Sequence, residues 1–231
     1  MENIVQRLNK PRAILAIGAV VFVGIVLLAA HERASQAVAR TLTPGDVTLT
    51  DVERSALDAD IAAAYVELAD DDDKNDFNAY VKIALAKEDL GDREGAAAIY
   101  RDMNERYAGN YLSFQNLGIL YQEDKKCELA SEQFLRAIAN APRIAHHYRN
   151  IVNLYTYDCP EYVHDIPVVL QDGLAIMPNS VDILSLMAVY HRDFGTIEDA
   201  IHWYEFLLVY DQENRTAIDE VRELREQLRG I

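Results

Sequence analysis

Residues 111–144 read YLSFQNLGILYQEDKKCELASEQFLRAIANAPRI, and the spacing of their large and small residues is the main indication of the fold. In this stretch the large and small positions are spaced as Phe114-x2-Leu117-Gly118-x2-Tyr121, then Ala130-x3-Phe134, then Pro142. Bulky residues recur 34 positions apart on both sides of it, with one interval of 36 between Phe134 and Leu170: Tyr80, Phe114 and Tyr148; Tyr100 and Phe134; Leu170 and Tyr204. Repetition with this period is typical of an array in which each unit is a helix pair packed on its neighbours.

The spacing is that of a helix-turn-helix repeat, and the chain resembles the tetratricopeptide-repeat (TPR) family. In register, four units cover residues 77–110, 111–144, 145–180 and 181–214. The second unit matches the family at every signature position, whereas the first has Ala84 for glycine and Ala108 for proline. The resemblance implies an all-α fold, a TPR superhelix (α-solenoid) of about four units.

Small residues mark the positions where the two helices of a unit cross. Alanine stands there in three units, at positions 96, 130 and 200, and allows close approach of the backbones. Gly91 and Gly195 fall between the paired helices, where we expect positive φ. The third unit is irregular: it has two extra residues around 158–162, and Ile166 replaces the crossing alanine, so a shorter second helix is expected from about Pro167.

The repeats are flanked by a lead-in segment and a terminal helix. Residues 31–76 are interpreted as a juxtamembrane linker and one helix, which Thr50 and Glu53 begin as a capping box. Residues 215–231 have one apolar stripe and are expected to cap the array. The acidic run 70–76 lacks the glycine and glutamate of a calcium-binding EF-hand loop, so a solvated loop is favoured over an ion site.

Residues 13–30 form an uncharged run of 18, long enough as a helix to cross a bilayer. A retained transmembrane helix is therefore predicted. The alternative is a secretory signal peptide, but its apolar region is usually shorter. Arg7, Lys10 and Arg12 precede the run, and Arg33 and Arg40 follow it, so the positive-inside rule favours a cytoplasmic tail at residues 1–12. The expected location is the bacterial inner membrane, with single-pass topology and a periplasmic repeat domain.

The composition limits the classes of partner. Lys+Arg number 22 and Asp+Glu 38, giving a net charge of -16 in 231 residues. A chain so acidic repels nucleic acid. Because 50% of residues are hydrophobic, the acidity indicates a solvated exterior and not disorder. No phosphate-binding loop or metal-ligand motif occurs, so neither a cofactor nor a small-molecule substrate is expected, and we do not expect an enzyme.

The resemblance implies a partner-binding groove lined by the first helix of each unit. Carried onto this sequence, its most polar positions are Asn116, His146, Arg149, Asn150, Asn153, Tyr157 and Arg192. Arg149 and Asn153 repeat a cation and amide pair with which some family members hold a peptide carboxylate, although the rest of that clamp is missing. The other interpretation is a solvated face with local salt bridges.

Cys127 and Cys159 fall in the helix-helix turns of consecutive units, on the same edge of the stack. Adjacent turns are too far apart for a disulfide unless the insertion beside Cys159 closes the gap. In an oxidising compartment a disulfide is one possibility, and two small buried residues are the other.

Together these features predict a membrane-tethered scaffold that binds one or more proteins or an extended peptide in or beside an envelope complex. Such a role would serve assembly, secretion or chaperone-accessory functions. The alternative is a constitutive structural subunit of a large membrane complex. A third class, an enzyme or small-molecule binder with its pocket in the third unit, has less support.

Overall fold

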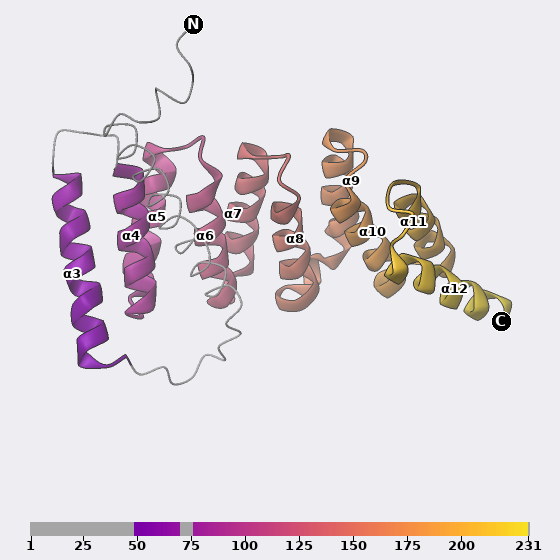
Figure 1. The fold of residues 1–231 in the computed structure, drawn as a ribbon, viewed down its shortest axis with the longest axis horizontal. Coiled ribbons are helices and arrows are strands. Elements are labelled where there is room, and N and C mark those ends of the chain that lie inside the picture. The colour runs from indigo at the N-terminus through magenta and orange to yellow at the C-terminus, as the bar shows by residue number, and fades with distance from the viewer. Residues whose placement is uncertain (1–48, 70–75, 231) are drawn as a thin grey trace, which may run out of the picture. The chain divides into compact units, whose positions relative to one another are not determined.

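The computed structural model describes residues 49–69 and 76–230, and all regular structure in these ranges is helical. The predicted membrane segment, residues 13–30, and nearly all of the acidic run 70–76 lie outside them. Figure 1 shows the described helices following one another in a row from α3 to α12. An all-α solenoid is therefore confirmed for this part of the chain.

The lead-in helix α3 (Asp51–Leu68) begins with the capping box expected from the sequence. The Thr50 backbone N–H donates to Glu53 Oε2 at 2.8 Å, and the Glu53 N–H donates to Thr50 Oγ1 at 3.2 Å. These two hydrogen bonds satisfy donors that would otherwise be free at a helix N-terminus. Ala64 of α3 is buried against α4, where it joins a small cluster with Ala79 and Ile83.

Four helix pairs follow in the order of the repeats. The first helices are α4 (Asp76–Asp89), α6 (Tyr111–Glu123), α8 (Ala145–Asn153) and α10 (Val181–Phe194). The second helices are α5 (Arg93–Arg106), α7 (Cys127–Asn140), α9 (Ile166–Ile176) and α11 (Ile197–Tyr210). One continuous core runs from Ala84 of α4 to Tyr190 of α10, so neighbouring pairs share buried side chains.

The crossing alanines are where the sequence places them. Ala96, Ala130 and Ala200 are fully buried, and the aromatic ring four residues after each is buried with it. Gly118 serves the same close contact from the first helix, since a Cβ there would lie 2.7 Å from the Phe134 ring. Small residues thus bring the helices together, and aromatic rings fill the space between layers.

The turns within the units only partly follow the glycine prediction. Gly91 has φ of 79°, as expected, and Lys125 takes a positive φ of 59° in the second unit without glycine. The expectation for Gly195 is wrong, because its φ is −107°. A Cβ at this position would lie 2.9 Å from the backbone oxygen of His191, so Gly195 is needed for a close approach and not for positive φ.

The third unit departs from the helix-turn-helix plan. After α8 the chain forms a π-helical turn, Leu154–Asp158, and then a 3₁₀ helix, Pro160–Asp165. Helix α9 has 11 residues and starts at Ile166 with proline in its first turn, which confirms the expected start of a short second helix. The extra residues are therefore accommodated between α8 and α9, while Ile166 is buried in the core.

The array ends with α12 (Arg215–Arg229), which packs on α11 through Ala217, Val221 and Leu224. Asn214 caps it, accepting a hydrogen bond from the Ala217 N–H at 3.0 Å. The residues between the buried positions are charged except for Ile218, which is 43% exposed. A single apolar stripe and a polar outer face agree with a terminal helix that packs on one side only.

Candidate partner-binding face

The polar positions of the third unit belong to one short segment. His146, Arg149, Asn150 and Asn153 lie on α8, and Tyr157 lies on the π-helical turn that follows it. His146, Arg149 and Asn153 are exposed, and the Tyr157 side chain is 78% exposed. We call His146, Arg149, Asn153 and Tyr157 the third-unit patch. It presents a cation, an amide and an aromatic ring to solvent.

Arg149 forms an ion pair with the next unit. Its Nη2 lies 2.8 Å from Oδ1 of Asp182 on α10. The two side chains are 48% and 58% exposed, so solvent screens the pair and it contributes little to stability, at most about 1 kcal/mol. The pKa of His146 is lowered by partial burial and by the charge of Arg149. Arg149 is therefore a cation whose present carboxylate partner is easily replaced.

Asn150 behaves differently from its neighbours in the patch. Its Nδ2 is buried, and it makes no hydrogen bond within the part of the chain that the structure describes. An amide donor in this state carries a desolvation cost of about 1–3 kcal/mol. Asn150 is half-buried, and its Nδ2 is not open to solvent as the exposed patch residues are.

The remaining two predicted groove residues are engaged in internal contacts. Arg192 Nη1 lies 2.7 Å from Glu220 of α12, and its Nε lies 2.7 Å from Asp193. The hydrogen bond that Arg192 donates to Asp193 is the main reason that the pKa of Arg192 is raised. Arg192 thus joins α10 to the terminal helix.

Asn116 belongs to a hydrogen-bonded chain between the first two units. Asn116 Nδ2 donates to the Tyr100 hydroxyl at 3.3 Å, and that hydroxyl donates to Glu88 Oε1 at 2.6 Å. Burial raises the pKa of Glu88, and burial together with the nearby Glu88 charge raises that of Tyr100. Asn116 therefore positions α6 against α4 and α5 more directly than it serves a partner.

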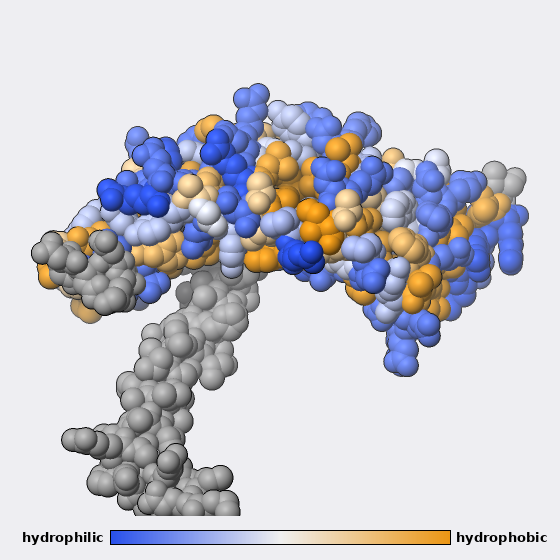
Figure 2. All heavy atoms as spheres, turned by 90° about the horizontal axis from the view of Figure 1, so that it is seen from above, coloured by the Kyte–Doolittle hydropathy of each residue, from blue (hydrophilic) through white to orange (hydrophobic). Residues whose placement is uncertain are grey.

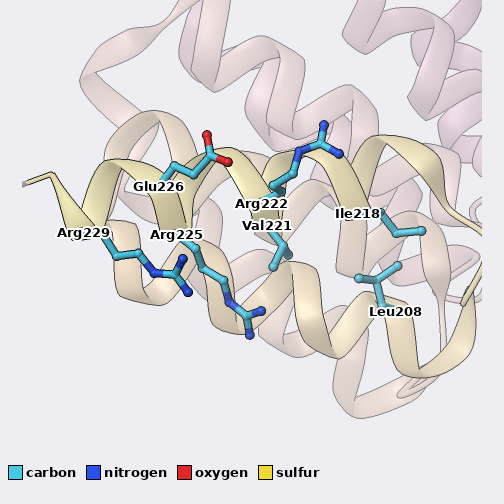
Figure 3. Close-up of a pocket in the computed structure, with 7 residues that line it drawn as sticks. All are labelled: Leu208, Ile218, Val221, Arg222, Arg225, Glu226 and Arg229. Atoms are coloured by element: carbon cyan, nitrogen blue, oxygen red, sulfur yellow. The ribbon is translucent and has the colours of Figure 1, made fainter.

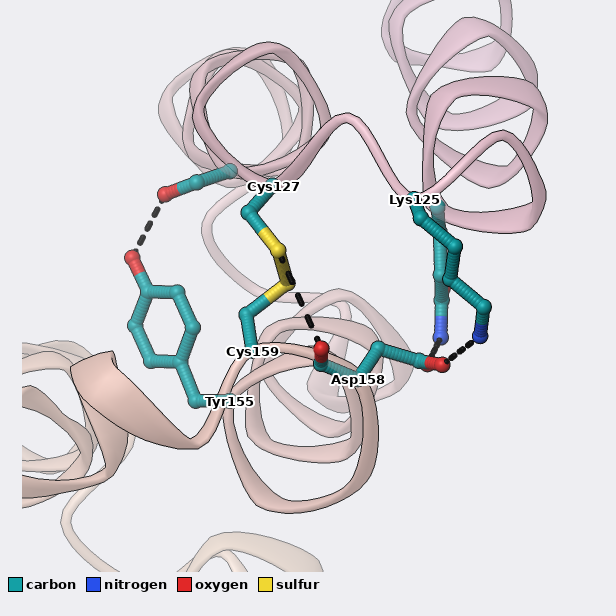
Figure 4. Close-up of a disulfide and its surroundings, with 7 residues drawn as sticks. Lys125, Cys127, Tyr155, Asp158 and Cys159 are labelled. Atoms are coloured by element: carbon teal, nitrogen blue, oxygen red, sulfur yellow. Dashed lines mark hydrogen bonds and ion pairs between the residues drawn. A yellow bond between two sulfur atoms is a disulfide. The ribbon is translucent and has the colours of Figure 1, made fainter.

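Cys127 and Cys159 form a disulfide beside the third-unit patch (Figure 4). Their Cα atoms are 5.9 Å apart, within the range that a disulfide spans, and Cys159 is fully buried. The bond joins the first residue of α7 to the residue that separates the π-helical turn from the 3₁₀ helix. The inserted residues thus bring the chain close enough to the preceding unit.

Polar contacts beside the disulfide hold the same turn. Asp158 accepts a hydrogen bond from Gln122 Nε2 at 2.5 Å and pairs with Lys125 (Figure 4 shows the latter). Burial by itself would raise the pKa of Asp158, but the hydrogen bonds from Lys125 and Gln122 lower it. The hydroxyls of Ser131 and Tyr155 share a hydrogen bond of 2.5 Å. Sequence reasoning missed these contacts, because they join residues more than 20 positions apart.

His147 lies next to the patch but faces the interior. It is 1% exposed, and its ring is 4.7 Å from that of Tyr111 between centroids. Neither ring nitrogen has a hydrogen-bond partner among the described residues. Burial, and then the neighbouring His146, lower the pKa of His147 to about 4. It is therefore a neutral core residue at neutral pH.

Within residues 49–69 and 76–230, no group of three His, Cys, Asp or Glu side chains is arranged to hold a metal ion. None of the helices in the same ranges is long and apolar enough to cross a membrane. Figure 2 shows one face of the molecule, where mainly hydrophilic residues surround hydrophobic ones gathered near the middle and at one end. The contacts available on the described surface are thus mixed polar and apolar.

Comparison with known proteins identifies the fold. No protein-family model and no curated protein matches the chain. A solved structure of MamA protein superposes with a TM-score of 0.50 and 18% identity, over 66% of this chain and 82% of that one. A tetratricopeptide repeat protein from Parabacteroides merdae ATCC 43184 has a TM-score of 0.53 and 15% identity, over 75% of this chain and 66% of that one. The described residues therefore have the fold of a tetratricopeptide-repeat solenoid.

Proposed function

We propose that this TPR-like solenoid is a membrane-tethered scaffold that binds a protein partner, through an extended peptide segment, at the third-unit patch. The observation that carries the proposal is the exposure of Arg149, Asn153 and Tyr157 on one segment whose C-terminal turn is bonded to the preceding unit. The disulfide and Asp158 hold its backbone, so these side chains are presented without first having to be ordered. Such preorganisation lowers the entropic cost of binding.

The patch has the chemistry needed to hold a peptide. An exposed tyrosine supplies contact area at a low cost in conformational entropy, and the Asn153 amide can both donate and accept hydrogen bonds. Arg149 supplies a charge-assisted hydrogen bond to a carboxylate, which is the stronger kind. Arg149 is paired with Asp182 in the structure, and a carboxylate of the partner would compete with Asp182 for the Arg149 guanidinium.

The partner is to be identified by photo-crosslinking in intact membranes. A photoreactive amino acid is placed at Tyr157, and a matched control at Glu132, which is exposed on α7 outside the patch. The expected result is a crosslinked protein at position 157 that is absent or much weaker at position 132. Equal crosslinking at both positions would contradict a specific patch.

Binding of the identified partner by two variants then tests the role of Arg149. Arg149→Ala removes the cation and should weaken binding roughly tenfold. Asp182→Asn removes the competing carboxylate and should strengthen binding, although it touches the same ion pair. If both variants bind as the wild type does, the patch is only a solvated face with local salt bridges.

We further propose that residues 13–30 anchor the scaffold in the bacterial inner membrane and that the repeats lie on the periplasmic side. The apolar run and its flanking cations support the anchor and its direction. The disulfide supports an oxidising space, because such bonds rarely persist in the cytosol. A protease added to spheroplasts should digest the repeats and spare a membrane fragment that begins at Met1. Protection of the repeats until the membrane is broken would reverse the topology.

A structural subunit of a membrane complex is the second candidate. Leu129 and Leu135 of α7 and Val168 of α9 are large exposed apolar side chains on second helices, away from the third-unit patch. Solubilisation in mild detergent distinguishes the two roles. Stoichiometric co-purification with other proteins favours the subunit, whereas a partner lost on dilution favours a docking scaffold.

A further inference from the structure

The C-terminal end of the solenoid has an open groove between α11 and α12. Its volume is about 330 Å³, and its apolar lining residues are Leu208, Ile218 and Val221. Three arginines and one glutamate complete the lining: Arg222, Arg225, Arg229 and Glu226. Figure 3 shows Arg225 and Arg229 extending side by side from α12. We call this groove the basic end.

The opposite end has a groove of about 440 Å³ between α3 and α4. Its apolar lining is formed by Leu57 and two alanines of α3 and by Leu85 and Ala86 of α4. The charged lining residues are three carboxylates and one lysine: Asp60, Glu67, Asp89 and Lys82. We call this groove the acidic end.

Several of these charges have no intramolecular partner. Arg229, Asp60 and Asp89 form no ion pair within the described part of the chain. Burial raises the pKa of Asp89, so its ionised form would gain from a nearby cation. Arg222 pairs with Asp219, and Arg225 with Glu205, but all four side chains are substantially exposed. Such pairs are weak and exchange readily.

The two grooves have complementary charge and lie at opposite ends of the row of helices (Figure 1). Contact between two basic ends or between two acidic ends would bring like charges together, which is unfavourable. A basic end facing an acidic end brings arginines to unpaired carboxylates. It also covers apolar residues that are exposed at both ends, including Ile218 and Leu85. The occupant that satisfies both grooves is a second copy of this chain.

We propose that the chain associates head to tail, with the arginine edge of α12 from one copy docked in the α3–α4 groove of the next. The contact joins two different surfaces, so a dimer still has one free basic end on one copy and one free acidic end on the other. Association therefore extends beyond a dimer unless the chain of copies closes into a ring. This inference goes beyond the proposed function and does not involve the third-unit patch.

The first test is the mass of the full chain in detergent micelles, measured by sedimentation velocity over a range of protein concentrations. The mass should rise with concentration beyond that of a dimer. Salt should reduce it, because the Debye length falls from roughly 10 Å at 0.1 M to about 3 Å at 1 M ionic strength. A wild-type protein that stays monomeric throughout, or whose association is insensitive to salt, would overturn the proposal.

Charge reversal separates the two ends. Arg225→Glu/Arg229→Glu alters only the basic end, and Asp60→Arg/Asp89→Arg alters only the acidic end. Each variant alone lacks one side of the contact, and its self-association should be at least roughly tenfold weaker. The control, Arg143→Glu, changes an exposed arginine outside both grooves and should associate as the wild type does.

Mixing the two reversed variants gives the most specific result. The intact basic end of one matches the intact acidic end of the other, and the two reversed ends are again opposite in charge, so the mixture should regain the association that each variant alone lacks. A symmetric interface predicts the opposite, because a variant altered only at the unused end would still form dimers by itself. Failure of the mixture to associate, with both variants fully helical by circular dichroism, would also overturn the proposal.

A second measurement does not depend on the charge variants. A photoreactive residue replacing Leu85 in the wild-type full chain should crosslink to α11 or α12 of another copy, identified by mass spectrometry of mixed isotope-labelled protein. Crosslinks confined to other segments would exclude the proposed contact.

Discussion

The second and third units solve the same packing problem in opposite ways. In the second unit the glycine is on the first helix, where Gly118 contacts the Phe134 ring of the second helix. In the third it is on the second helix, where a Cβ at Gly173 would lie 2.7 Å from the Tyr148 ring of the first helix. The close approach is preserved although the contact uses different positions, because Tyr148 corresponds to Phe114 and Gly173 to Ala137. What the fold requires is one small residue facing one large ring.

The units also differ in how their turns are held. Arg93 of α5 reaches the end of α6, with its Nε 2.7 Å from Asp124 and its Nη2 2.8 Å from the Leu120 carbonyl oxygen. The irregular turn of the third unit is held to the preceding unit by the disulfide and by Asp158. A backbone that departs from the regular helix pair is thus fixed by a covalent bond and by side-chain contacts.

Removing the disulfide should have the largest effect on stability, because it frees the irregular turn of the third unit from the second unit. The bond closes a loop with a sequence separation of 32, so the chain-entropy model gives a loss of about 3–4 kcal/mol for Cys127→Ala/Cys159→Ala. Urea unfolding of the variant and of reduced wild type should give similar values. Equal stability of the variant and oxidised wild type would show that the irregular turn keeps its conformation without the disulfide.

The next effect is a pH dependence specific to the third unit. The pKa of His147 is about 4 in the folded chain, against about 6.5 when exposed. Above pH 6.5 the residue is neutral in both states. As pH falls from 6.5 to 4, the unfolded chain binds a proton that the folded chain does not, so stability falls, by on the order of 2–3 kcal/mol.

His147→Leu isolates this term, because the carboxylates titrate equally in both proteins. Ser113 occupies the corresponding position in the second unit and is also buried. Unfolding free energies of the wild type and the variant, measured at pH 4.5 and at pH 7, should converge toward neutral pH and diverge in acid. If the difference in unfolding free energy between the two proteins is the same at both pH values, His147 takes up a proton as readily in the folded chain as in the unfolded chain.

The need for glycine against an aromatic ring in each of the two units is tested by Gly118→Ala and Gly173→Ala. Each added methyl meets an aromatic ring at 2.7 Å, so each should destabilise by about 1–2 kcal/mol after the gain in helix propensity. Gly109→Ala is the control, since nothing lies within 4 Å of its added Cβ. If Gly173→Ala is as stable as this control, the third unit does not need glycine against the Tyr148 ring.

The smallest effect on stability is the difference between two carboxylates that form ion pairs between units. Asp158 of the third unit pairs with Lys125 of the second, and Asp182 of the fourth unit pairs with Arg149 of the third. Asp158 is mostly buried and Asp182 is mostly exposed. Asp158→Asn should cost about 1 kcal/mol, whereas Asp182→Asn should change the unfolding free energy by less than about 0.5 kcal/mol. Chemical denaturation at neutral pH measures both, and a reversed order would contradict the role given to Asp158.

The regular parts of the fold could be predicted because each depends on residues close in sequence. The crossing alanines, the capping box at Thr50 and the short helix from Ile166 follow from spacing and local hydrogen bonding. Gly195 shows the limit of such reasoning, since a turn glycine can be needed for close packing instead of positive φ. Gly195 directly precedes Thr196, which caps the next helix.

The candidate site could be predicted only in part. The sequence identified the polar positions of α8, but it did not distinguish the exposed Arg149 and Asn153 from Asn116 and Arg192, which make internal contacts. Partners such as Glu220 come from other units, and their distance along the chain carries no local signal. Burial of His147 with no hydrogen-bond partner in the described residues is likewise visible only in three dimensions.

The amino-acid sequence alone predicts stacked helix pairs, because a period of 34 residues, interrupted once by 36, recurs along the chain and places large and small residues on facing helices. Only the tertiary structure shows how the irregular third unit is bonded to the second unit, and which arginines form exposed ion pairs that a partner could replace. It also decided that grooves of opposite charge lie at the two ends of the row. These features depend on contacts between distant residues, and such contacts exist only once the units have packed together.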